Sequence, residues 1–167
     1  MEPIEAIKKS SIFAGLAEKD LDEILKITRE RRFQKGDVVM KEGEEGDTMY
    51  LVVEGEVGVS KSLTMKFADD DYRETEKILT RFVPEDHVIL GEMALIGKDN
   101  RSATISARSD CIFLEIKKDD FLMLIEQNPK LGIRLLTNLS QLLADRLRQS
   151  SQDIIRLTTA LSIALSK

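Results

Sequence analysis

The 167-residue sequence contains one cysteine, Cys111, one histidine, His87, and no tryptophan. A single cysteine cannot form a disulfide within the chain, and one cysteine with one histidine is too few for a structural zinc site, which takes four such ligands. The same shortage argues against a cysteine–histidine catalytic pair. We therefore expect a protein that is not an enzyme and that holds no metal.

Long apolar runs and excess positive charge are also missing. No segment approaches the ~18 apolar residues that a membrane-spanning helix needs, and the first residues lack the features of a secretory signal. We expect a cytoplasmic protein without membrane contact. The net charge of −5 argues against binding along a nucleic-acid backbone, which depends on Lys and Arg. Because 42% of the residues are apolar, the chain can bury one core, and we expect a single domain over residues 1–167.

The hydrophobic pattern changes twice along the chain. Leu21, Ile24 and Leu25 have helical spacing, so we place N-terminal helices over about residues 3–28. From about 29 to 116, short apolar runs alternate with glycine-containing turns, which predicts a mainly β sandwich or jelly roll. Its most polar stretch, residues 66–76, reads as the solvated tip of a hairpin.

Helical spacing returns over about residues 117–167 and predicts a long C-terminal helix after Asn128-Pro129. Part of this helix repeats apolar residues at alternating spacings of four and three, which is typical of a coiled-coil seam between two copies of the chain. The alternative is a helix that lies against its own barrel. The seam consists of Leu136, Ser140, Leu143, Leu147, Ser150, Ile154, Leu157, Leu161 and Ala164.

The segment from Gly91 to Thr104 combines a short helical turn with an acid, an arginine and a hydroxyl group. A ligand that carries one phosphate needs a cation that stays charged, backbone N–H groups and an open backbone. Arg101, the turn from Glu92 to Ala94, and Gly91 supply these features. If the ligand also carries a ribose, the Glu92 carboxylate can accept a hydrogen bond from its 2′-hydroxyl group. The alternative is that Glu92 and Arg101 pair with each other at the surface.

Residues Gly91 to Leu95 followed by Arg101 to Thr104 resemble the phosphate-binding cassette of the cyclic-nucleotide-binding domain family, of the catabolite activator and cAMP-dependent kinase regulatory-subunit type. The resemblance covers most of the chain and implies an eight-stranded jelly roll with helices at both ends. Further elements match in order: Ser11 to Leu16, Lys35-Gly36-Asp37, Gly46-Asp47 with Met49-Tyr50, and Asn128-Pro129.

The resemblance also implies roles for individual residues. Glu92 becomes the acceptor for the ribose hydroxyl and Arg101 the partner of the cyclic phosphate. In the activator branch, two hydroxyl residues on the long helix touch the adenine, and Ser150-Ser151 are the matching pair. The ligand-binding residues expected are Gly91, Glu92, Met93, Ala94, Arg101, Ser102, Ala103, Ser150 and Ser151.

We therefore expect a non-catalytic sensor that binds a 3′,5′-cyclic purine nucleotide, cAMP rather than cGMP, and signals occupancy through its C-terminal helix to an unknown effector. The chain is expected to form a homodimer through that helix. DNA-binding members of the family carry a winged-helix domain after it, and residues 152–167 are too few for one, so no DNA binding is expected. The alternative function is a jelly-roll dimerisation or docking module that binds no nucleotide.

Overall fold

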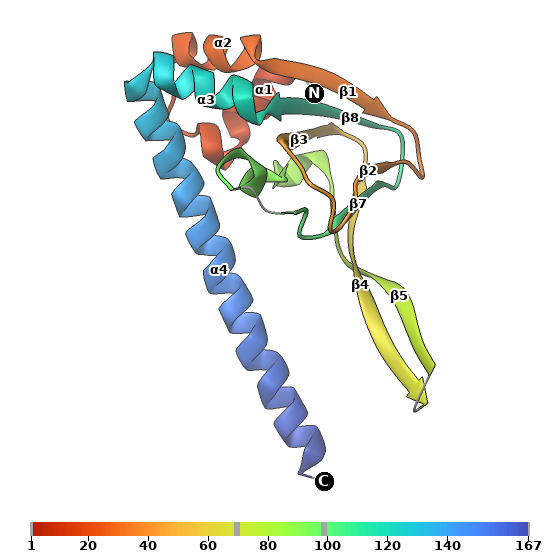
Figure 1. Cartoon of the computed structure of the whole chain (residues 1–167). Coiled ribbons are helices and arrows are strands. Elements are labelled where there is room, and N and C mark those ends of the chain that lie inside the picture. The colour runs from red at the N-terminus through yellow and green to blue at the C-terminus, as the bar shows by residue number, and fades with distance from the viewer. Residues whose placement is uncertain (1, 69–70, 98–99, 167) are drawn as a thin grey trace.

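Two four-stranded antiparallel sheets form the centre of the protein (Figure 1). The computed structural model describes residues 2–68, 71–97 and 100–166, with residues 63–68 and 71–76 described by their backbone alone. The first sheet has the order β1 (Thr28–Phe33), β8 (Cys111–Lys117), β3 (Thr48–Glu54), β6 (Ile89–Leu90). The second has the order β2 (Val38–Met40), β7 (Thr104–Ala107), β4 (Val57–Ala68), β5 (Asp71–Phe82). The eight strands of the expected jelly roll are present as these two sheets, which together we call the roll.

Helices precede and follow the sheets. The chain begins with α1 (Pro3–Lys9), the 3₁₀ turn η1 (Ser11–Phe13) and α2 (Glu18–Lys26), and it ends with α3 (Lys118–Gln127) and α4 (Pro129–Leu165). Two further 3₁₀ turns, η2 (Pro84–Asp86) and η3 (Glu92–Leu95), flank β6. The expectation of a mainly β protein is wrong, because the four α-helices hold more of the described residues than the strands do, and α4 alone has 37 residues.

Strand β3 separates two hydrophobic cores, and six of its seven residues are buried. Met49, Leu51 and Val53 contribute to the core shared with the helices, whereas Tyr50 and Val52 contribute to the core inside the roll. Alternate residues of a strand point to opposite faces, so a strand covered on both faces is a continuous apolar run. Inside the roll, the rings of Tyr50 and Phe113 meet edge to face, with centroids 5.7 Å apart.

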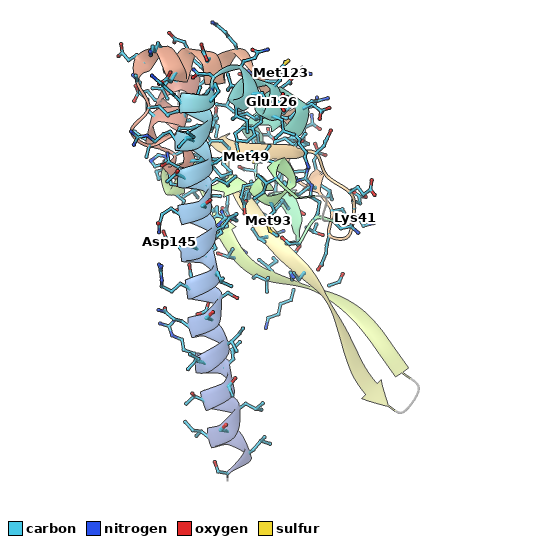
Figure 2. All side chains as sticks on the ribbon, turned by 60° about the vertical axis from the view of Figure 1, so that its left-hand side comes forward. Lys41, Met49, Met93, Met123, Glu126 and Asp145 are labelled. Atoms are coloured by element: carbon cyan, nitrogen blue, oxygen red, sulfur yellow. The ribbon has the colours of Figure 1, made fainter. Side chains whose placement is uncertain are left out.

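Asn128 separates α3 from α4, as the sequence predicts. Its side-chain oxygen accepts a hydrogen bond from the backbone N–H of Leu131 at 3.3 Å, and Pro129 takes the first helical position. Leu131, Leu135 and Leu139 of α4 are buried in the core shared with the helices. From Leu147 onward, every described residue of α4 is exposed, and the helix projects beyond the roll (Figures 1 and 2).

Strands β4 and β5 form a ribbon that also projects beyond the roll (Figure 1). Strand β4 pairs with β7 only from Val57 to Ser60, and past that point it pairs with β5 alone. The expected hairpin is present. Its tip is shorter than expected, because most of residues 66–76 belong to the two strands, and residues 69–70 lie outside the described residues.

Candidate functional site

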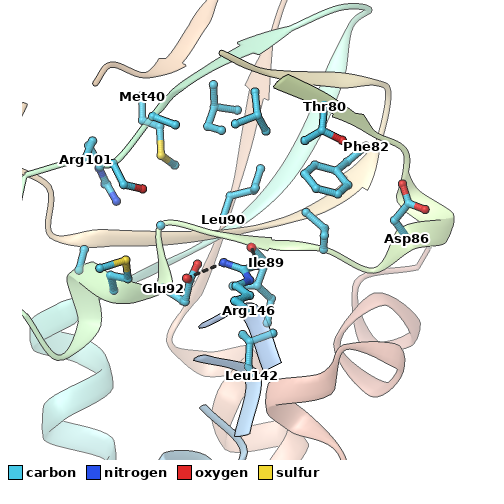
Figure 3. Close-up of a pocket in the computed structure, with 18 of the residues that line it drawn as sticks. Met40, Thr80, Phe82, Asp86, Ile89, Leu90, Glu92, Arg101, Leu142 and Arg146 are labelled. Carbon is cyan, nitrogen blue, oxygen red and sulfur yellow. Dashed lines mark hydrogen bonds and ion pairs between the residues drawn. The ribbon is translucent and has the colours of Figure 1, made fainter. Parts of the chain in front are cut away.

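A cavity of about 540 Å³ opens between the roll and α4. This volume lies within the usual range for small-molecule sites. Residues of β4, β5 and β7 line one side, and β6 with η3 lines another (Figure 3). The α4 side chains on the wall are Leu142, Asp145, Arg146 and Gln149, whose spacing places them on one face of the helix.

Arg101 supplies a half-buried positive charge at one end of the cavity. Its Nη1 donates to the backbone oxygen of Thr48 at 2.7 Å, and its Nη2 donates to Thr48 Oγ1 at 2.6 Å. Burial lowers the pKa of Arg101 from its ordinary value, and the nearby Tyr50, Asp47 and Glu92 oppose this effect. Arginine nonetheless remains a cation in proteins.

Both hydrogen bonds of the Arg101 side chain go to uncharged groups of Thr48. Among the described residues, no acidic oxygen forms an ion pair with its guanidinium. A half-buried cation whose partners are a neutral carbonyl and a hydroxyl can still neutralise an anion, and the planar guanidinium suits phosphate. This end of the cavity is therefore chemically fit for a phosphate group.

Two glycines provide the space that the Arg101 guanidinium occupies. A Cβ atom on Gly46 would lie 2.0 Å from Arg101 Nε, and one on Gly91 would lie 2.5 Å from Nη1. Gly91 also has a φ of +76°, which disfavours a larger residue. Any side chain at either position therefore competes with the guanidinium for the same volume.

Glu92 is the buried acid of the cavity, with 3% of its surface exposed. Its Oε1 accepts a hydrogen bond from Arg146 Nη1 at 2.5 Å, and Arg146 Nη2 donates to the backbone oxygen of Ile89 at 2.7 Å (Figure 3). The surface pair between Glu92 and Arg101 that the sequence left open is not formed. Instead, a buried carboxylate of η3 is paired with a cation of α4, which links the cavity floor directly to the long helix.

The end of the cavity away from Arg101 holds the ring of Phe82. Thr80 lies beside it on β5, across from β6, and Asp86 lies near them (Figure 3), whereas Val59 and Val88 are further lining residues of the cavity. The cavity thus has a cation at one end, a buried acid in its floor and the aromatic ring of Phe82 at the other end, an arrangement that suits a ligand with an anionic group, a hydroxylated centre and a flat ring.

Comparison with known proteins identifies the family of the chain. The profile of the family described as "Cyclic nucleotide-binding domain" matches residues 30–128. The chain belongs to the cyclic nucleotide-binding domain family. The matched range runs from β1 to the end of α3 and contains both Glu92 and Arg101.

Relatives of this domain occur in proteins of different architecture. The chain is 29% identical over 148 residues to the cyclic AMP receptor protein of Thermus thermophilus, a match that covers 89% of this chain and 62% of that protein. It is 32% identical over 121 residues to a cyclic nucleotide-gated potassium channel of Mesorhizobium japonicum, covering 72% of this chain and 29% of the channel. The chain therefore spans less than two thirds of either relative.

A similar solved structure has the same arrangement of elements. The crystal structure of the Thermus thermophilus catabolite activator protein superposes with a TM-score of 0.74 and 30% identity, over 89% of this chain and 63% of that one. The fold of this chain is therefore that of a cyclic nucleotide-binding domain.

Most of the residues expected at the ligand site lie together. Gly91, Glu92, Met93, Ala94, Arg101, Ser102 and Ala103 all line the cavity. Ser150 and Ser151 do not line the cavity of this chain, and both are exposed on α4. The Ser151 hydroxyl donates to the backbone oxygen of Leu147 at 2.9 Å.

The sequence did not predict that Thr48, Arg146 and Gln149 belong to the site. Arg146 and Glu92 are 54 positions apart, and no short-range pattern in the sequence connects them. One signal in the sequence could have indicated the two α4 residues. Leu142, Arg146 and Gln149 share a helix face, and each of them precedes a residue of the expected coiled-coil seam by one position. That face lines the cavity.

The described part of the chain covers residues 2–68, 71–97 and 100–166. No group of three or more potential metal-ligating side chains is found in that part of the chain. None of the helices there is long and apolar enough to cross a membrane.

Proposed function

We propose that this domain is a non-catalytic sensor that binds a 3′,5′-cyclic purine nucleotide, cAMP in preference to cGMP, and transmits occupancy through α4. The observation that carries the proposal is the position of two opposite charges on one cavity: Arg101, a cation that pairs with no carboxylate among the described residues, and Glu92, a buried acid. The family of the chain agrees with this ligand class.

In this proposal, the cyclic phosphate lies against Arg101 and Ser102. A charge-assisted hydrogen bond in a partly desolvated site is stronger than a neutral one, so the phosphate accounts for much of the affinity. Gly91 and Ala94 keep the backbone close to the ligand, and the Ala103 N–H is a further donor to the phosphate. The end near Thr80 and Phe82 accommodates the purine, whose flat face can pack on the Phe82 ring.

The ribose connects the ligand to the long helix. Its 2′-hydroxyl donates to Glu92, whose carboxylate is already paired with Arg146 of α4. A ligand that contacts Glu92 therefore changes the energy of the contact between η3 and α4. This contact is the proposed route by which occupancy reaches the C-terminal helix and, through it, an effector that is not yet identified.

The projecting part of α4 supports a homodimer. Leu147, Ile154, Leu157 and Leu161 of the expected seam are between 59% and 71% exposed. Such a row of apolar residues at coiled-coil spacing is stabilised when a second copy covers it. In the dimer, Ser150 and Ser151 of either protomer are the proposed adenine contacts, and they are the basis of the preference for cAMP.

The proposed location is the cytoplasm. Cys111 is free and buried, which suits a reducing compartment.

Calorimetric titration of the purified chain with cAMP, cGMP and 5′-AMP tests the ligand assignment. We expect saturable binding of cAMP, weaker binding of cGMP and little binding of 5′-AMP, whose doubly charged open phosphate costs more to remove from water than the singly charged cyclic phosphate. If no cyclic nucleotide binds to the folded protein, the sensor proposal is refuted in favour of a nucleotide-free docking module. If cGMP displaces cAMP at equal concentration, the base preference is wrong.

A further inference from the structure

Thr48 is the residue that holds Arg101 in place. It is the first residue of β3, has 7% of its surface exposed and faces Lys117 in the pairing of β3 with β8. The preceding carbonyl, that of Asp47, accepts a hydrogen bond from the backbone N–H of Lys118 at 2.7 Å. The backbone at Thr48 is therefore fixed on both sides by the edge where β8 continues into α3.

Both ends of the Arg101 guanidinium are bound by this one residue. Nη1 donates to the backbone oxygen of Thr48, and Nη2 donates to its hydroxyl oxygen. The backbone contact is available to any residue at this position, whereas the second contact requires a hydroxyl. An arginine has five N–H donors, and the other three make no side-chain hydrogen bond to the residues that the structure describes.

This two-point contact matters because a free arginine side chain has many rotamers. Fixing one of them on ligand binding costs conformational entropy. A guanidinium that is already held beside Gly46 and Gly91 avoids part of that cost.

We infer that the Thr48 hydroxyl is a positioning group for anion binding: it orients the Arg101 guanidinium before the ligand arrives, and the phosphate of the ligand then meets a fixed cation. The inference rests on the proposed function, because the anion is the cyclic phosphate. Thr48 itself need not touch the ligand.

The test compares two substitutions that differ in one group. Thr48→Val keeps the shape of the side chain and removes the hydroxyl, and Thr48→Ser keeps the hydroxyl. Titration with cAMP is expected to show binding weakened by about 5- to 30-fold in Thr48→Val and changed by less than about twofold in Thr48→Ser. Thermal unfolding of both variants verifies that each is folded.

A double-mutant cycle separates positioning from a general structural effect. In an Arg101→Lys background, the ammonium group cannot make the two-point contact, so Thr48→Val is expected to have little further effect on cAMP affinity. Equal losses from Thr48→Val with Arg101 and with Lys at position 101 would overturn the inference, as would unchanged cAMP affinity in a folded Thr48→Val. These outcomes are distinct from failure of the proposed function, in which the wild-type protein itself binds no cyclic nucleotide.

Discussion

Replacing Gly46 with alanine adds a single carbon atom at the point where the phosphate-binding cation lies. The new Cβ would stand 2.0 Å from Nε and 2.2 Å from Cζ of Arg101. Non-bonded heavy atoms approach to ~3.5 Å at best, so the guanidinium has to withdraw by ~1.5 Å. The Gly46 backbone is outside the left-handed region, so the change acts through this clash rather than through backbone strain.

The size of the effect follows from the contacts that are lost. Hydrogen bonds of 2.6 and 2.7 Å to Thr48 do not survive a displacement of ~1.5 Å. Because Arg101 is only half-buried, water replaces much of what is lost, and the free energy of unfolding falls by no more than about 1–2 kcal/mol. Ligand affinity suffers more, because the cation leaves the phosphate position. A loss of about 1.4–2.8 kcal/mol corresponds to about 10- to 100-fold weaker binding.

Calorimetric titration with cAMP measures this loss, and Gly58→Ala is the matched control. A Cβ on Gly58 would lie 2.8 Å from Nε of Arg108, an exposed arginine that does not line the cavity. Gly58→Ala thus displaces a different guanidinium and is expected to leave cAMP affinity unchanged. Equal affinities of Gly46→Ala and the wild-type protein, with both folded, would refute the assignment of Arg101 to the phosphate.

Four further substitutions test other parts of the site. Arg101→Leu removes the phosphate partner and should weaken cAMP binding at least ~10-fold in calorimetry. Glu92→Gln should weaken it less, because an amide oxygen still accepts a hydrogen bond from the ribose. If Glu92→Gln weakened binding more than Arg101→Leu, the roles assigned to these two residues would be wrong. Arg146→Met leaves the buried Glu92 carboxylate unpaired and should lower the free energy of unfolding by roughly 1–3 kcal/mol, measured by thermal unfolding. Part of this stability should return when Arg146→Met is combined with Glu92→Gln. Unchanged stability in Arg146→Met would show that the ion pair is dispensable. Ser150→Leu should strengthen the ligand-free dimer in sedimentation experiments, because leucine suits a coiled-coil seam. It should also weaken cAMP binding, because it removes a proposed adenine contact. A wild-type protein that stays monomeric with and without cAMP would contradict the dimer.

Local signals were sufficient for much of the fold. The helical spacing of Leu21, Ile24 and Leu25 in α2, the helix junction at Asn128 and the glycine turns between strands are each local signals, so they can be read from the sequence. The length of the ribbon of β4 and β5 could not be read in this way. The sequence pattern of residues 66–76 is polar, yet hydrogen bonding between β4 and β5 extends through most of it.

The same division applies to the site. Gly91, Glu92 and Arg101 lie within one short segment, and their chemistry was visible there. Thr48 and Arg146 come from β3 and α4, and only the packing of those elements brings them to Arg101 and Glu92. The cavity wall is formed by the α4 face that includes Gln149, because the buried positions Leu135 and Leu139 fix how the helix is turned against the roll.

A crystal structure of the protein grown with cAMP tests the central claim most directly. The account predicts one nucleotide in the cavity, with its cyclic phosphate within hydrogen-bond distance of Arg101 and its ribose 2′-hydroxyl on Glu92. A cavity that stays empty at a saturating concentration of cAMP, or a nucleotide bound with its phosphate away from Arg101, would contradict it.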